Sequence, residues 1–132
     1  MGLTLSVNKN NFEDMQRFIN NKNITIINTL DLNQQQCLIQ NTISADKETD
    51  YINKLIKTNL AKAIVIYGKN CNDENVITKY KQLKELGFKN LSIYIGGLFE
   101  WLLLQDIYGD DIFPTTSKET DFLKYKSPSL LT

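Results

Sequence analysis

Two short apolar runs separated by a helical pattern constrain the fold of this chain more than any other feature. The first run, residues 63–67, is an unbroken series of mostly β-branched and aromatic residues that ends at Gly68, as expected of a parallel strand covered on both faces. The second run, 91–95, has apolar residues at alternate positions. Between them, residues 79–86 favour a helix, and Gly87 is a natural residue to end it. A strand, a crossover of about 20 residues and a second strand predict a right-handed βαβ unit with parallel strands.

Similar patterns predict the remaining elements. Apolar residues at helical spacing predict a helix that begins after a capping asparagine at position 10 or 11. Residues 24–28 predict a strand, and residues 46–59 predict a helix that leads into the strand at 63. An apolar helix follows the second strand and continues to about Tyr108. At the start of the chain, a short strand is predicted by the alternation of Leu3, Leu5 and Val7 with polar residues.

The order of these elements over residues 83–101 resembles the second half of a rhodanese-like domain. A helix ending in Leu-Gly-Phe leads to a strand, then to the pair Gly96 and Gly97, and then to Trp101. The resemblance implies a three-layer α/β domain with a parallel sheet of about five strands flanked by helices. We expect this domain to span residues 1–114, followed by a C-terminal tail at 115–132.

Composition excludes several classes of function. The 132 residues suffice for one domain with a hydrophobic core. Fifteen basic and fifteen acidic residues cancel, which argues against a nucleic-acid partner. The sequence has no histidine, which excludes a histidine-dependent catalytic triad and a zinc site with imidazole ligands. We expect no metal and no cofactor.

The two cysteines do not make a disulfide framework or a metal cluster. Cys37 is expected to be a small buried apolar residue. Neither a secretory signal pattern nor an apolar run long enough to span a membrane is present, so we expect an intracellular, cytoplasmic protein. Gly2, followed by a serine at position 6, fits the pattern for N-myristoylation, which would give only a weak membrane contact.

The resemblance places the active loop between the strand ending at Tyr67 and the helix after it. A sulfurtransferase of this family needs a thiolate at the first position after the strand, where backbone N–H groups of the loop stabilise it. That position is Gly68, which has no nucleophile. The loop also looks about two residues longer than the family's usual one. The residues expected to form a binding loop are Gly68, Lys69, Asn70, Asn72, Asp73, Glu74 and Asn75.

Cys71 lies three residues beyond the expected position of the nucleophile, although counting back from Gly87 puts it only one residue away. The carboxylates of Asp73 and Glu74 disfavour a thiolate nearby and repel anionic substrates. A phosphatase loop would need an arginine, and none occurs after residue 17.

A second departure lies at the end of the strand at 24–28. Catalytic relatives tend to have Asp-x-Arg there, a charged pair that braces the active loop. This chain has Asn28, Thr29 and Leu30 instead.

The leading hypothesis is therefore a non-catalytic rhodanese-like domain that acts as a protein-binding or structural module, as a subunit of a larger assembly. The alternative is a divergent sulfurtransferase or persulfide carrier that uses Cys71, and a phosphatase or another enzyme ranks last. The expected partner surface is the loop face at the carboxyl ends of the strands, residues 29–36, 68–75 and 96–97. The tail from Thr115 is a second candidate, which lies over the domain, docks on a partner or stays mobile.

Overall fold

The computed structural model describes residues 7–129, which form a five-stranded sheet with the strand order β1-β5-β4-β2-β3. All neighbouring strands are parallel. The strands are β1 (Lys9–Asn10), β2 (Ile24–Asn28), β3 (Thr42–Ile43), β4 (Ala63–Tyr67) and β5 (Leu91–Tyr94). The helices are α1 (Phe12–Phe18), α2 (Ala45–Thr58), α3 (Glu74–Glu85) and α4 (Gly97–Tyr108), with short 3₁₀ turns η1 (Leu32–Gln34) and η2 (Phe122–Tyr125).

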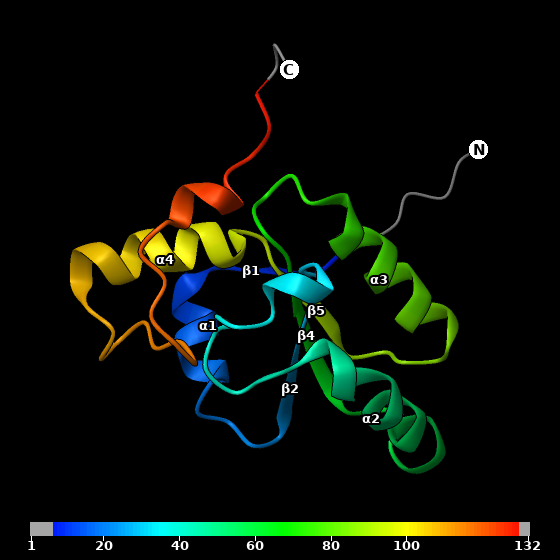
Figure 1. The fold of residues 1–132 in the computed structure, drawn as a ribbon. Helices are drawn as coiled ribbons and strands as arrows, with labels where there is room; N and C mark the ends of the chain where they lie inside the picture. Colours follow the sequence, from blue (N-terminus) through cyan, green and yellow to red (C-terminus); the bar gives the residue numbers. More distant parts are fainter. Residues whose placement is uncertain (1–6, 130–132) are drawn as a thin grey trace.

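Helices α1 and α4 cover one face of the sheet, and α2 and α3 cover the other (Figure 1). The predicted three-layer architecture is therefore confirmed. Successive side chains of β4 enter opposite cores: Val65 packs with α1 and α4, whereas Ile64 and Ile66 pack with α2 and α3. Burial on both faces explains why the sequence of this strand is apolar without interruption.

The predicted βαβ unit is present, with Ile64 opposite Leu91 in the register of β4 and β5. Gly87 ends α3 with a positive φ of 108°. Its N–H donates to the carbonyl of Lys84 (3.1 Å), and the N–H of Phe88 donates to that of Leu83 (3.2 Å). This is the Schellman pattern, and it turns the chain sharply into β5.

The predicted opening strand can be compared with the structure only at Val7. Leu3 and Leu5 lie outside the described residues, and Val7 is not in a strand; β1 comprises only Lys9 and Asn10. The strand is short because Asn11 already caps α1. The Asn11 side chain accepts from the Asp14 N–H, and the Asp14 carboxylate accepts from the Asn11 N–H.

The end of β5 also differs from the prediction. Ile95 lies beyond the end of β5, and its side chain is 36% exposed. Within residues 7–129, no helix is long and apolar enough to cross a membrane.

The tail after Pro114 lies over the domain, one of the three outcomes left open by the sequence. Leu38 and Thr116 exchange hydrogen bonds, with the Thr116 N–H donating to the Leu38 carbonyl and the Leu38 N–H donating to the Thr116 hydroxyl. Further along, the Tyr125 side chain is buried in the core shared with α1 and α4. Residues 115–129 thus pack as part of the same body as the sheet.

Tyr67 provides a test of how the end of β4 is held. Its buried hydroxyl accepts a hydrogen bond from the Ile39 N–H (3.0 Å) and shares another with the Thr42 hydroxyl (2.9 Å). We expect Tyr67→Phe to lower the free energy of unfolding by about 1–3 kcal/mol, because a buried N–H loses its acceptor. Urea denaturation measures this. The matched control Tyr108→Phe alters an exposed ring and should change stability by less than about 0.5 kcal/mol; equal effects would contradict the interpretation.

Candidate functional site

The loop between β4 and α3 spans residues 68–73, because α3 begins at Glu74. Asp73 is the N-cap residue of that helix, and its side chain accepts a hydrogen bond from the Asn75 N–H. Glu74 and Asn75, which the sequence analysis includes in the binding loop, therefore form the first turn of the helix. The acidic side chain of Asp73 at the N-cap stabilises the helix, because it accepts a hydrogen bond from an otherwise free N–H and interacts favourably with the positive end of the helix dipole.

The Asp73 carboxylate also folds back over the start of the loop. Its Oδ2 accepts a hydrogen bond from the Lys69 N–H (3.0 Å) and one from the Thr29 hydroxyl (3.3 Å). Its Oδ1 accepts from the Asn75 N–H (3.1 Å). One carboxylate thus binds the beginning of the loop, the beginning of α3 and the segment that follows β2.

This carboxylate occupies the space beside Gly68. A Cβ atom added to Gly68 would lie 2.3 Å from Asp73 Oδ2, 2.6 Å from Val76 Cγ2 and 2.8 Å from Thr29 Oγ1. All three distances are shorter than van der Waals contact. A side chain at position 68, where the resemblance places the nucleophile, would have to displace the carboxylate of Asp73.

The N-terminus of α4 holds the other side of the loop. The Leu98 N–H donates to the Gly68 carbonyl (2.9 Å), and the Phe99 N–H donates to the Lys69 carbonyl (2.8 Å). Gly97 makes this approach possible: its φ is +70°, and a Cβ there would lie 2.8 Å from both Asn70 N and Gly68 O. The second glycine of the pair is thus required by the close contact of two backbones.

The first glycine of the pair has a different neighbour. A Cβ on Gly96 would lie 2.4 Å from the carboxyl group of Glu100. That carboxyl accepts a hydrogen bond of 2.6 Å from the Tyr94 hydroxyl. Burial, together with the adjacent Glu100 carboxylate, raises the pKa of Tyr94 above its ordinary value, so the hydroxyl stays protonated and donates.

Where the resemblance leads one to expect a charged brace, the structure has a pair of neutral amides. Asn28 Nδ2 donates to Gln35 Oε1 (3.1 Å), and Gln35 Nε2 donates to Asn28 Oδ1 (2.9 Å). Asn28 also donates to the Ile43 carbonyl and accepts from the Leu30 N–H. Gln35 Oε1 accepts from the N–H of Ala45, the first residue of α2. The end of β2 is therefore braced without charge.

The single cation of the loop is already paired. Lys69 Nζ lies 3.0 Å from Asp31 Oδ2, and both side chains are partly exposed. An exposed ion pair of this kind contributes little stability, but it draws the ammonium group toward the segment after β2. The chain's single arginine, Arg17, is in α1, where it pairs with Asp14 of the same helix.

The two cysteines lie in different surroundings, and neither is in a disulfide. Cys37 is buried as predicted, its thiol donates to the Ser117 carbonyl (3.4 Å), and burial raises its pKa. Cys71 is exposed and borders a cavity of about 190 Å³ that Lys9 and Tyr94 also line. Among the described residues, the Cys71 thiol forms no hydrogen bond.

The C-terminal tail covers the loop. The buried Asn70 side chain donates to the Tyr125 carbonyl (2.8 Å), and the Asn72 side chain donates to the Ser127 hydroxyl (3.1 Å). In Figure 1, η2 lies against α4, next to the loop that precedes α3. The two surfaces considered separately from the sequence, the loop face and the tail, therefore form one continuous surface.

The structure brings together most of the residues singled out in the sequence. The segments after β2, β4 and β5 meet through the contacts of Thr29 with Asp73, of Asp31 with Lys69 and of Gly97 with Asn70. Gly2 lies outside the described residues. Within residues 7–129, no group of three Cys, Asp or Glu side chains is placed to hold a metal ion.

Sequence reasoning missed the second contact of Asp73 and the burial of Tyr125. An acidic residue before a helix signals its capping role, but nothing local signals that the same carboxylate reaches Gly68. Tyr125 follows Phe122 and Leu123 in a segment that is otherwise polar, and this apolar pattern is too short to mark Tyr125 as a core residue.

A parallel sheet in this order, with a loop after β4 enclosed by the N-termini of α3 and α4, places the chain in the rhodanese-like class of α/β domains. The family model described as Rhodanese-like domain matches residues 11–104, so the chain belongs to the rhodanese-like domain family.

Solved structures agree with this fold. The Alr3790 protein from Anabaena sp. is 19% identical, with 87% of this chain and 86% of that chain covered and a TM-score of 0.60. The BH2092 protein from Bacillus halodurans is 18% identical, with 71% of this chain and 70% of that chain covered and a TM-score of 0.59. A single-domain sulfurtransferase from Saccharomyces cerevisiae is 14% identical, with 86% of this chain and 100% of that chain covered and a TM-score of 0.57. At these identities the likeness concerns the fold alone. Comparison with curated proteins finds no significant match.

The contact between Gly68 and Asp73 can be measured by a double-mutant cycle. We expect Gly68→Ala to destabilise the domain by about 1–3 kcal/mol, because the new methyl group meets the Asp73 carboxylate. Asp73→Ser keeps a helix-capping oxygen but shortens the side chain. In the double variant, the loss should be smaller than the sum of the two single losses by at least about 0.5 kcal/mol in urea denaturation. Additive losses would show that the two residues do not compete for space.

The hydrogen bonds that join the loop to the tail give a second test. We expect Asn70→Ala to increase amide hydrogen exchange across residues 122–127, because a buried donor to the Tyr125 carbonyl is lost. Asn72→Ala removes a bond at the surface and serves as the matched control with a smaller effect. The two exchange profiles are compared by mass spectrometry. A tail equally protected in both variants and in the parent protein would refute the role assigned to Asn70.

Proposed function

We propose that this rhodanese-like domain does not transfer sulfur and acts as a protein-binding or structural module within a larger assembly. The observation that carries the proposal is the Asp73 carboxylate, which fills the space beside Gly68 where a sulfurtransferase would hold its thiolate. A site already occupied by the protein's own anion is a poor receptor for a second one.

Electrostatics support the same conclusion. A sulfur-transferring loop stabilises a thiolate and then a persulfide through backbone N–H groups. Here the N–H groups of Lys69 and Asn75 donate to the Asp73 carboxylate. The Lys69 ammonium is paired with Asp31. An incoming thiosulfate or phosphate would meet carboxylates and would find no cation in the loop free to bind it.

The same features favour binding. The loop is held by α4 on one side and by the tail on the other, so it presents a fixed surface to a partner. Pre-organised surfaces lose little conformational entropy on binding. We propose a protein partner rather than nucleic acid, because the charges of the chain balance. The two free thiols favour a reducing, intracellular compartment. Acylation of Gly2 stays a prediction from its sequence pattern.

One observation favours the alternative of a divergent sulfurtransferase or persulfide carrier. Cys71 is exposed and borders a cavity that Lys9 and Asp73 also line, so its thiol is accessible to a sulfur donor. Lys9 alone does not supply the several hydrogen-bond donors that would stabilise a persulfide on Cys71.

The proposal predicts the outcome of an activity assay. Purified protein should show no thiosulfate:cyanide sulfurtransferase activity above that of a Cys71→Ser variant, because position 68 has no nucleophile and the loop donors are occupied. Thiocyanate formation is measured, with an active rhodanese assayed in parallel as the positive control. Turnover clearly above the Cys71→Ser control would overturn the proposal.

Intact-mass spectrometry separates the alternative from the proposal. After treatment with thiosulfate, a carrier that uses Cys71 would take up the outer sulfur atom onto its thiolate as sulfite leaves, and it would gain the mass of one sulfur atom; Cys71→Ser would not. We expect no such stable adduct on the folded wild-type chain. Alkylation before the treatment verifies that the exposed Cys71 thiol was available to react.

A further inference from the structure

Two exposed apolar surfaces of opposite charge lie on different sides of the molecule. We call the first the acidic patch; it consists of Asp106, Ile107, Tyr108, Asp110, Asp111 and Ile112. We call the second the lysine patch; it consists of Leu60 and Leu86 with the nearby charged residues Lys57, Lys62, Lys84, Glu85 and Lys89, of which only Lys62 is half-buried. Large apolar side chains this exposed, grouped together and rimmed by charge, are typical of interaction sites.

The acidic patch is apolar at its centre. Ile107, Tyr108 and Ile112 are 67%, 63% and 50% exposed, and all three surrounding aspartates are exposed as well. The patch is held firmly on the domain. The Tyr108 ring lies 6.2 Å from that of the buried Phe113, and the Ile112 carbonyl accepts a hydrogen bond from the Gln16 side chain (3.0 Å).

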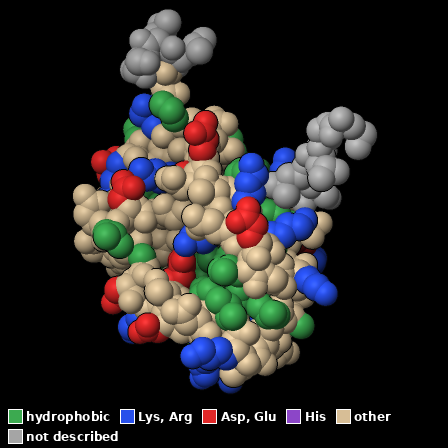
Figure 2. Space-filling model, turned by 90° about the vertical axis from the view of Figure 1, so that its right-hand side faces the viewer, with side chains coloured by type: hydrophobic (Ala, Val, Ile, Leu, Met, Phe, Trp, Pro, Cys, Tyr) green, Lys and Arg blue, Asp and Glu red, His purple; other side chains and the backbone are tan. Residues whose placement is uncertain are grey.

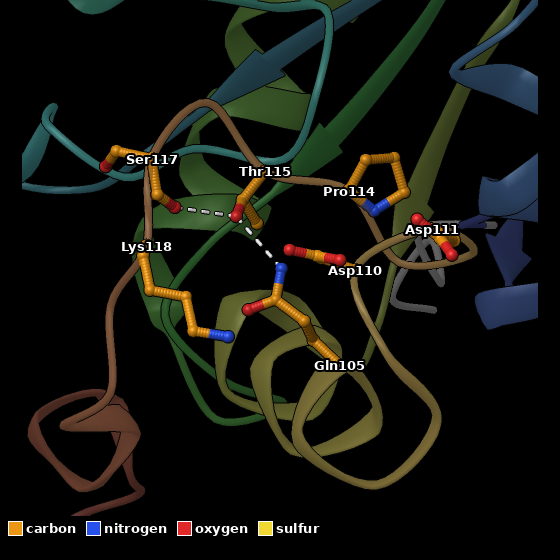
Figure 3. Close-up of a pocket in the computed structure, with 7 residues that line it drawn as sticks. All are labelled: Gln105, Asp110, Asp111, Pro114, Thr115, Ser117 and Lys118. Atoms are coloured by element: carbon orange, nitrogen blue, oxygen red, sulfur yellow. Dashed lines mark hydrogen bonds between the residues drawn. The ribbon is translucent and has the colours of Figure 1, made fainter.

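A polar pocket adjoins the acidic patch between the end of α4 and the tail (Figure 3). Its volume is about 380 Å³. In Figure 3, the Gln105 side chain donates to the Thr115 hydroxyl, and the Asp110 carboxylate and the Lys118 side chain point into the pocket. Among the described residues Lys118 forms no ion pair with Asp110, so the Asp110 carboxylate is open to a cationic side chain of a second molecule.

The lysine patch is formed where α2 and α3 end. Leu60 and Leu86 are 37% and 49% exposed, and Leu60 packs on Gly87, where a Cβ would lie 3.3 Å from Leu60 Cδ1. A cavity of about 490 Å³ there is lined by Leu60, Gly87 and Lys89 among others. Figure 2 looks onto the side of α2 and α3; hydrophobic side chains gather there, with Lys and Arg side chains below and to the right.

We propose that the acidic patch of one copy of this chain binds the lysine patch of a second copy. The two patches are complementary: each has a small apolar centre, one with aspartates around it and the other with four lysines and one glutamate, and the chain as a whole has no net charge. In the contact, Leu60 and Leu86 pack on the apolar centre of the acidic patch. An ammonium group from Lys84 or Lys89 reaches the Asp110 carboxylate.

The positions of the patches determine the kind of assembly. The acidic patch lies at the end of α4, and the lysine patch lies at the ends of α2 and α3, on the opposite face of the sheet (Figure 1). One copy therefore has both patches available at different sides, and the contact is heterologous. Repeated contacts of this kind give a ring or an open chain of subunits rather than a two-fold dimer.

This inference goes beyond the proposed function and does not depend on it, because neither patch includes residues of the loop after β4. Few apolar side chains take part, so we expect weak association that is seen only at high protein concentration. Because charge contributes at exposed positions, salt should weaken it.

Sedimentation velocity of the full chain tests the proposal. At low salt, the weight-average mass of the wild type should rise with concentration above the monomer's 15.2 kDa and should fall back at high salt. Asp110→Lys/Asp111→Lys and Lys84→Glu/Lys89→Glu should each remain monomeric. A mixture of the two variants should associate again, because the altered patch of each complements the altered patch of the other. The control Lys47→Glu/Asp50→Lys reverses two exposed charges of α2 outside the lysine patch, leaves the net charge unchanged and should behave as wild type.

Three outcomes would overturn the proposal: a wild type that stays at the monomer mass at every concentration, association that survives both charge reversals, or a mixture that does not associate. Circular dichroism verifies that each variant is folded. Ile107→Ser/Ile112→Ser provides a second way to disable the acidic patch without changing its charge, and it too should abolish association.

Discussion

The carboxylate of Asp73 is the interaction on which the shape of the loop depends. It accepts hydrogen bonds from the Lys69 N–H, the Asn75 N–H and the Thr29 hydroxyl, which come from the loop, from α3 and from the segment after β2. Because the three donors belong to different segments, one anion fixes their relative positions. A side chain at Gly68 is incompatible with this arrangement. The Asp73 carboxylate can take this position only because residue 68 has no side chain, and hence no nucleophile.

Most of the fold could be predicted from the sequence because its signals are local. The uninterrupted apolar run at 63–67 indicates a strand buried on both faces, and Gly87 marks the end of α3. The errors lie at element ends. The edge strand β1 is reduced to two residues because the capping arrangement of Asn11 begins α1 directly after it. Ile95 continues the alternation of β5 but lies beyond its last paired residues.

The site could be predicted only in part. The absence of a nucleophile at Gly68 and the uncharged residue at Asn28 can be read from single positions. The reach of the Asp73 side chain and the burial of Tyr125 depend on segments far apart in the sequence, which only the packed structure brings together. The tail could not be placed for the same reason: its contacts with Asn70 and Leu38 bridge more than fifty positions of the chain.

The uncharged brace between Asn28 and Gln35 has a consequence of its own. Neither amide titrates, and neither attracts counter-ions. A carboxylate–guanidinium brace would loosen as acid protonated the carboxylate. The hydrogen bonds between Asn28 and Gln35 should instead keep the same geometry in acidic and neutral surroundings, and in dilute and concentrated electrolyte.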